Sequence, residues 1–157
     1  LKGAVLGGGC ETALSCDIRI TDTTLKMALP EINYGILPDT GGTQMMTRLI
    51  GPSRTKYMVM TGERIDADIA LEWGAVDFVV APEELDARAL AIAKKSAAKP
   101  PRCLAIATTT IDQASAGDVR NGIAQELMAQ SYLFKTEDYH EARAALREKR
   151  TPTYKGK

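Results

Sequence analysis

The stretch LGGGCE (residues 6–11) places three consecutive glycines directly before a cysteine and a glutamate. Glycine allows positive φ and close approach of another backbone or a ligand, and it costs roughly 0.5 to 1 kcal/mol relative to alanine within a regular element. The run follows an apolar, strand-like segment (residues 1–6) and precedes a short helical segment around residues 10–15. The unpaired N–H groups and the positive dipole end of that helix favour a developing negative charge. The run therefore indicates half of an oxyanion hole, with a tight turn for close packing as the structural alternative.

The spacing of these glycines does not fit the common phosphate-binding loops. A G-x-G-x-x-G fingerprint that starts at Gly7 needs another glycine where the chain has Thr12, and the Lys-Ser/Thr pair of a Walker loop is absent. What remains is a strand that ends in glycines and continues into a helix. We therefore favour an anion-stabilising helix start over a cradle for a nucleotide phosphate.

The overall composition excludes several classes of partner. The 157 residues carry 20 Lys and Arg against 20 Asp and Glu, so no net charge attracts nucleic acid or acidic lipid. Three cysteines without a Cys-x-x-Cys spacing and one histidine favour neither a disulfide framework nor a zinc site. No uninterrupted apolar stretch reaches about 18 residues. We expect a soluble intracellular protein without metal, nucleic-acid or membrane partners, in the cytoplasm or, alternatively, the mitochondrial matrix.

Short apolar runs and glycines predict strands joined by tight loops in the first third of the chain, at residues 1–6, 17–21 and 25–29. From Gly42 onward the apolar spacing becomes helical. Three short helices, each ending at a glycine that can serve as a C-cap, are expected at residues 42–51, 53–62 and 66–74. A buried strand is expected at 76–80, and a long helix should begin at Pro82 and stop before Pro100. Further helices are expected at residues 101–115, 119–134 and 136–150.

Four segments, taken in order, resemble the crotonase superfamily of enoyl-CoA hydratases and isomerases. They are GAVLGGGCETALSCDIRI, ALPEINYGILPDTGGTQMMTRLIG, TGERIDADIALEWGAVDFVVAPEEL and LREKRTP, and the resemblance extends from Leu1 to about Tyr154. It implies an α/β fold in which a spiral of ββα units is followed by a helical trimerisation region. On this basis residues 1–81 form the C-terminal part of the spiral core with the active-site glutamates. Residues 82–157 form the helical region for oligomerisation and CoA contact.

The same resemblance implies an acyl-CoA thioester as the substrate and no cofactor other than the coenzyme A that the substrate carries. It also implies that no metal takes part and that the assembly is a homotrimer or a dimer of trimers. Because the chain opens at Leu1 inside an apolar, strand-like run, we expect it to be the C-terminal portion of a longer chain. The other oxyanion donor and much of the CoA site would then lie upstream.

Matched residue by residue, the resemblance assigns roles to the glycine run and to two glutamates. Gly8 takes the position of the backbone N–H that meets the thioester oxygen, and Gly7 lies beside it in the substrate site. Glu11 and Glu31 fall on the two catalytic glutamates of the hydratases, with Glu11 activating water and Glu31 supplying the proton at Cα. Two carboxyl groups that flank one water can perform both proton transfers of hydration. The structural alternatives are a helix-dipole partner for Glu11 and a surface charge for Glu31.

Three further positions are assigned to the substrate site. Asp39 in PDTGG stands where hydratases often have glycine and where some isomerase-like members have an acid. Tyr34 stands where an aliphatic residue is usual, so it could narrow or polarise the acyl pocket. Lys149 in REKR matches a family lysine that meets the nucleotide phosphate of CoA as a point charge.

Enoyl-CoA hydratase activity is therefore our first hypothesis. An enoyl-CoA double-bond isomerase, the second, needs only one carboxylate; Asp39 favours it, whereas the presence of both Glu11 and Glu31 argues against it. The third hypothesis is a truncated, non-catalytic fragment whose helical half builds oligomers.

Four other residues are assigned no chemistry. Cys10 and Cys16 flank the predicted short helix and are expected to pack in the interior. His140 is expected on an exposed helical face. Trp73 is expected in the core or at a subunit contact, and not as a ligand platform.

Overall fold

The computed structural model describes residues 1–115 and 117–157, and it contains both helices and strands. The expected α/β class is confirmed. The chain divides into two compact units, Leu1–Ala89 and Leu90–Lys157, with the boundary inside helix α5 (Leu85–Ala97). All strands in the described part of the chain belong to the first unit.

Parallel pairing organises the strands of the first unit. β1 (Ala4–Leu6) pairs in parallel with β3 (Lys26–Ala28), and the short β4 (Ile65–Asp66) pairs antiparallel with the other edge of β3. β2 (Ile20–Asp22) and β5 (Phe78–Val80) form a separate parallel pair. Because parallel strands need a long crossover connection, helices lie between them in the sequence.

Glycines end the short helices of the first unit. The three predicted helices are confirmed as α2 (Gly42–Ile50), α3 (Pro52–Thr61) and α4 (Ala67–Trp73). Each is followed by a glycine with positive φ, namely Gly51, Gly62 and Gly74, because only glycine adopts this backbone conformation at little cost. The other helical elements of this unit, besides the start of α5, are α1 (Gly8–Leu14) and the 3₁₀ helices η1 (Pro30–Tyr34) and η2 (Pro82–Glu84).

The buried apolar residues of the first unit form one cluster, to which its strands and helices both contribute. Leu25, Met27 and Leu29, from β3 and its flanks, are fully buried, as are Met46 of α2 and Met58 of α3. Burial of one such side chain contributes about 1.5–3 kcal/mol to stability. The cluster therefore fixes β3 against α2 and α3, and with it the segments that leave the ends of the strands.

Two expectations about burial are wrong. The strand expected at residues 76–80 is shorter, and Phe78 at its start is exposed, because in the described structure the sheet that contains β5 has only β2 as a second strand. Cys16 is exposed as well, because α1 ends at Leu14 and the following residues 15–18 all lie at the surface.

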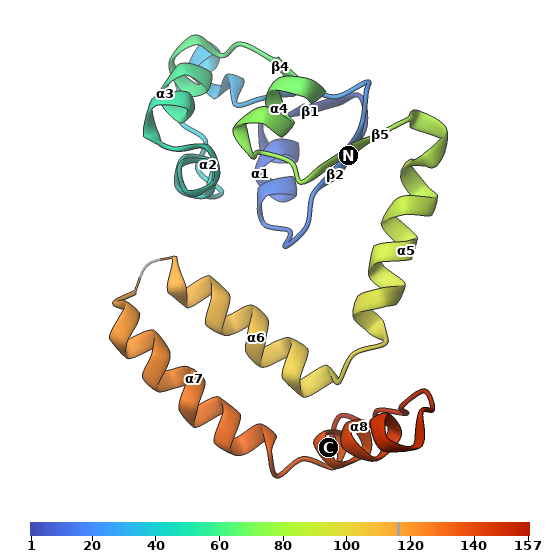
Figure 1. Cartoon of the computed structure of the whole chain (residues 1–157). Coiled ribbons are helices and arrows are strands. Elements are labelled where there is room, and N and C mark those ends of the chain that lie inside the picture. Colours follow the sequence, from blue (N-terminus) through green and yellow to red (C-terminus); the bar gives the residue numbers. More distant parts are fainter. Residues whose placement is uncertain (116) are drawn as a thin grey trace. The chain divides into compact units, whose positions relative to one another are not determined.

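The second unit is built from helices that the sequence predicts. The long helix predicted from Pro82 begins as η2 and continues as α5. α6 (Pro101–Ala114) and α7 (Val119–Leu133) lie side by side, and α8 (Glu137–Glu148) follows them in the chain (Figure 1). His140 is exposed on α8, as expected. None of the helices in the described residues combines the length and apolar character that a bilayer-spanning helix requires.

The C-terminal tail (residues 150–157) binds back onto α8. Asp138 accepts hydrogen bonds from the backbone N–H groups of Lys155, at 2.7 Å, and Gly156, at 2.9 Å. The carbonyl of Gly156 in turn accepts from Arg102 Nε at 2.6 Å. These bonds fasten the tail to α8 and to the start of α6.

A buried arginine connects the loop after α1 to the loop after α4. Arg19 Nε donates to the carbonyl of Ala75 at 2.9 Å, and Nη1 donates to the carbonyl of Cys16 at 2.6 Å. The backbone N–H of Arg19 donates to Asp77 Oδ2 at 2.7 Å, and Nη2 lies 3.7 Å from the same oxygen. Because buried carbonyl oxygens are costly without a donor, the guanidinium should contribute to the stability of this unit.

Replacing Arg19 with methionine should lower the free energy of unfolding by about 2 kcal/mol, because two backbone carbonyls lose a charged donor. Urea denaturation followed by circular dichroism measures this loss. Arg48→Met, at an exposed position on α2, is the matched control and should change stability by less than about 0.5 kcal/mol. Equal effects of the two substitutions would contradict a stabilising role for Arg19.

Cys10 of α1 is completely buried, as expected. Burial, with additional contributions from the carboxylates of Glu31 and then Glu11, raises the pKa of the Cys10 thiol from 9.0 to about 12. The thiol therefore remains protonated at neutral pH, whereas the thiolate is the form that attacks thiol reagents.

In the native protein we expect Ellman's reagent to modify Cys16, which is exposed, and to modify Cys10 only after unfolding. The folded state keeps the Cys10 proton while an unfolded thiol loses it. The free energy of unfolding should therefore fall as the pH rises from 9.0 toward 12, and this group should not affect stability below that range. Cys10→Ala should remove this alkaline loss. Fast modification of Cys10 in the native state would contradict the prediction.

Candidate active site

The C-terminal ends of β1 and β3 lie at the same edge of their sheet. The register pairs Leu6 with Ala28, and the N–H of Gly7 donates to the carbonyl of Ala28 at 3.1 Å. α1 begins directly after β1, and η1 begins shortly after β3. Ligands of open α/β sheets bind at the carboxyl ends of parallel strands. The pairing therefore brings together two helix starts, and each carries one of the predicted glutamates.

Glu11 lies in the first turn of α1 and is almost fully buried, with 3% relative exposure. Its Oε1 accepts hydrogen bonds from the backbone N–H groups of Thr40 and Gly42, each at 2.8 Å. Gly42 is the first residue of α2, so its N–H belongs to the positive end of that helix. The two bonds fix the orientation of the carboxylate, and they leave Oε2 as the oxygen that can accept a proton from water.

Glu31 enters the site from η1 and packs against the backbone of Gly7. A β-carbon on Gly7 would lie 3.0 Å from Glu31 Oε1, and Gly7 has a φ of 54°, so this approach requires glycine. The other oxygen, Oε2, is buried and has no hydrogen-bond partner within the described part of the chain. An unpaired buried carboxylate oxygen calls for an explanation, and a water or a substrate atom at a functional site provides one.

The two carboxylates have a common neighbour in the Cys10 thiol. Both raise its pKa together with burial, so Glu11 and Glu31 lie near one buried group. Gly42 packs closely against Glu11 and Pro38. A β-carbon on Gly42 would lie 2.7 Å from Pro38 Cβ and 2.8 Å from Glu11 Oε1. The structure thus brings Glu11, Glu31 and Gly7 into one cluster.

Gly8 is the first residue of α1 and is exposed beside this cluster. A β-carbon on Gly8 would meet no atom within 4 Å, so the space next to its backbone is open. N–H groups in the first turn of a helix have no partner within the helix. The geometry is therefore compatible with donation from the Gly8 N–H to a bound oxygen.

Three further predicted site residues are not part of the cluster formed by Glu11, Glu31 and Gly7. Tyr34, at the end of η1, is 80% exposed. Asp39 is exposed and directly precedes Thr40, whose N–H binds Glu11. Lys149 belongs to the second unit and forms the C-terminal cap of α8. Their roles in substrate binding stay predictions.

Sequence reasoning missed the backbone groups that hold Glu11. In PDTGG the sequence marks only the aspartate for the site, yet Thr40 and Gly42 supply the donors to Glu11, and Gly41 turns the chain into α2 with a φ of 101°. The signal was present, because a glycine pair before a helix repeats the pattern that the first glycine run shows before α1. The two glycine-rich helix starts meet at Glu11.

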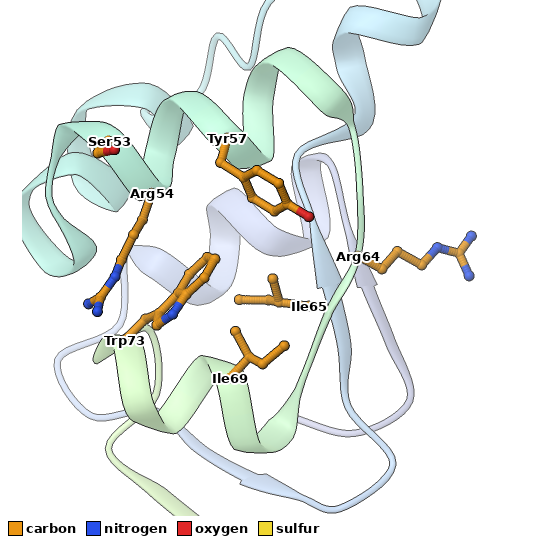
Figure 2. Close-up of a pocket in the computed structure, with 7 residues that line it drawn as sticks. All are labelled: Ser53, Arg54, Tyr57, Arg64, Ile65, Ile69 and Trp73. Atoms are coloured by element: carbon orange, nitrogen blue, oxygen red, sulfur yellow. The ribbon is translucent and has the colours of Figure 1, made fainter.

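A separate cavity of about 230 Å³ lies on the first unit between α3, β4 and α4 (Figure 2). Trp73 forms one wall; it packs on the core, as expected, and makes an edge-to-face contact with Tyr57 at 6.1 Å between ring centroids. Arg54 lies over the indole ring at 5.3 Å, whereas Arg64 points away from the cavity in Figure 2. Neither glutamate lines this cavity.

Comparison with known proteins identifies close relatives of the chain. The short-chain-enoyl-CoA hydratase of Clostridium acetobutylicum is 39% identical over 150 residues, which cover 96% of this chain and 58% of that protein. The 2,3-dehydroadipyl-CoA hydratase of Escherichia coli is 38% identical over 157 residues, which cover 100% of this chain and 62% of that protein. The chain thus spans less than two thirds of the length of these relatives.

Solved structures of enoyl-CoA hydratases also resemble the fold of this chain. The crystal structure of an enoyl-CoA hydratase from Bacillus anthracis superimposes with a TM-score of 0.94 at 40% identity, covering 99% of this chain and 60% of that chain. The crotonase-like fold expected from the sequence is thereby confirmed. A sequence profile described as "Enoyl-CoA hydratase/isomerase" matches residues 1–157. The chain therefore belongs to the enoyl-CoA hydratase/isomerase family.

Proposed function

We propose that this chain carries the acid–base centre of an enoyl-CoA hydratase, which adds water across the α,β double bond of an acyl-CoA thioester. The observation that carries the proposal is the asymmetric carboxylate pair. Glu11 is held by two backbone N–H groups through one oxygen, while Glu31 keeps a buried oxygen without a partner in the described residues. A water between the two carboxyl groups would satisfy that oxygen and would be held for reaction.

The mechanism assigns one proton transfer to each carboxyl group. As the water oxygen bonds to Cβ, Glu11 takes a proton from the water and Glu31 gives a proton to Cα. The electron pair of the double bond passes through the thioester carbonyl, whose oxygen becomes negative in the transition state. The N–H of Gly8 is one donor to that oxygen, at the positive end of α1. After the reaction Glu11 is protonated and Glu31 is not, and proton exchange through the next water returns both to their starting states. These residues need no cofactor beyond the CoA of the substrate.

A double-bond isomerase is the alternative that a specific residue favours. The exposed Asp39 lies next to Thr40, and therefore close to the bonds that hold Glu11. A third carboxylate there would provide another base for moving a proton between carbons. Crotonyl-CoA distinguishes the two activities, because hydration consumes the conjugated double bond, whereas the equilibrium of isomerisation favours the conjugated isomer that is already present.

We also propose that the second unit forms a subunit interface of a homotrimer or a dimer of trimers. α6 and α7 contain no buried residue within the described chain, although they carry many apolar side chains. Ile111, Val119 and Met128 are at least 70% exposed, and Leu127 is 66% exposed. Exposed apolar surface of this extent is typical of an interaction site, and a closed symmetric oligomer would cover it with copies of itself.

Replacing Glu11 or Glu31 with glutamine should lower kcat for hydration of crotonyl-CoA by about 100- to 10,000-fold, because each substitution removes one proton-transfer group. Loss of the absorbance of the conjugated thioester, followed with the full-length protein, measures the rate.

Glu72→Gln, at an exposed position on α4, is the matched control and should retain the wild-type rate. Hydration that persists in both active-site variants would overturn the two-carboxylate mechanism. An unchanged absorbance with wild-type protein would favour the isomerase instead.

Replacing Leu127 with glutamate should reduce the mass of the assembly toward that of one chain, because a charge would enter an apolar interface. Sedimentation equilibrium measures this mass. Gln125→Glu, at an exposed polar position on the same helix, should leave the mass unchanged. A wild-type protein that sediments as a single chain would refute the proposed interface.

A further inference from the structure

The cavity between α3, β4 and α4 has two aromatic walls that are nearly perpendicular to each other (Figure 2). The rings of Tyr57 and Trp73 lie 6.1 Å apart between centroids, with an angle of 81° between their planes. Ile65, which is 2% exposed, and the half-buried Ile69 line the cavity beside the two rings. A flat ring that enters such a corner stacks on one wall and meets the other with its edge, and aromatic rings favour both contacts. The shape therefore suits a planar aromatic ligand.

The volume of the cavity indicates the size of the group that it can take. An apolar cavity of roughly 150 Å³ holds one benzene molecule, whereas this cavity has a volume of about 230 Å³. The additional space accommodates a second fused ring or a short polar group. Neither of the predicted catalytic glutamates lines the cavity, so it is separate from the candidate active site.

Arg54 determines which charge a ligand of this cavity should carry. Its guanidinium lies 5.3 Å from the centre of the Trp73 ring, and the residue forms no ion pair in the described residues. Because Arg54 already occupies the cation position over the indole, it repels a second positive charge and disfavours a cationic ligand. Its planar array of donors matches the two oxygens of a carboxylate. The ligand is therefore expected to be anionic.

The charges also give the ligand a direction. In Figure 2 the Tyr57 hydroxyl and the Arg54 guanidinium lie at opposite sides of the cavity. The hydroxyl donates a hydrogen bond to Glu63, and this bond raises the pKa of the Tyr57 hydroxyl. The hydroxyl is thus already paired, and the Glu63 carboxylate repels a negative group on its side. A ligand with one anionic group therefore turns this group toward Arg54.

We infer that this cavity is a binding site for a small aromatic carboxylate, in which Arg54 binds the carboxylate and the rings of Tyr57 and Trp73 contact the aromatic body. The rings supply most of the contact area, and Arg54 supplies the preference for a negative charge. Because the cavity contains neither glutamate, the inference does not depend on the proposed hydratase activity.

The probe for this site is 2-naphthoate, and 2-naphthamide, which has the same rings but no charge, is its matched control. Titration calorimetry with the full-length protein should give a Kd for 2-naphthoate about tenfold lower than for 2-naphthamide, the effect of one charge-assisted hydrogen bond. Arg54→Met, at an exposed position on α3, should raise the Kd for 2-naphthoate about tenfold and leave the Kd for 2-naphthamide unchanged. Lys56→Met removes an exposed cation of the same helix that does not line the cavity, and it should leave both Kd values unchanged.

Three results would overturn the inference. The first is that the wild type binds neither probe at millimolar concentration, and the second is that it binds both with equal affinity. The third is displacement of 2-naphthoate by free coenzyme A, because the probe would then occupy the coenzyme A site and not this cavity. A Kd for 2-naphthoate that stays the same with saturating coenzyme A, together with the tenfold loss in Arg54→Met, would support a separate site.

Discussion

The parallel pairing of β1 with β3 is the constraint on which the candidate site depends. Because Leu6 is opposite Ala28, the segments that follow the two strands begin at the same edge of the sheet. A shift of one residue would turn the side chains of one strand to the opposite face, and Glu31 would no longer approach Gly7. The core around β3 opposes this shift, since the shift would turn Met27 out of the buried cluster. The same strand register thus determines both the packing of the core and the positions of the two glutamates.

Local signals in the sequence predicted much of the secondary structure. The glycines at 51, 62 and 74 mark the ends of three helices, because their positive φ is a property of the residue itself. The exposure of Phe78 was not predictable in this way. An apolar run predicts a buried strand whether or not other strands or helices pack on it. Whether they do depends on residues that are far away in the chain. The exposed Cys16 is a similar case, since its burial depends on where α1 ends.

In the candidate site, too, the sequence predicts some features and leaves out those that depend on contacts between distant segments. Glu11 and Glu31 were predicted because they match a family pattern, and the structure brings them to one buried thiol. The groups that hold Glu11 were not predicted, because the N–H of Thr40 and that of Gly42 are backbone donors that any residue type supplies. Only the folded chain reveals that α2 points its first turn at this carboxylate. The roles of Tyr34, Asp39 and Lys149 remain predictions that depend on bound substrate.

The distribution of the three cysteines has a practical consequence. Cys10 is enclosed in the core, whereas Cys16 and Cys103 are exposed, one in each of the two units. Residues 1–157 therefore offer one attachment point for a fluorescent dye on each unit, without any engineered cysteine. Energy transfer between a donor and an acceptor at these two points, in labelled chains diluted into an excess of unlabelled chains, would follow the separation of the two units within one chain. Addition of an acyl-CoA would then show whether the proposed ligand changes the distance between the two units.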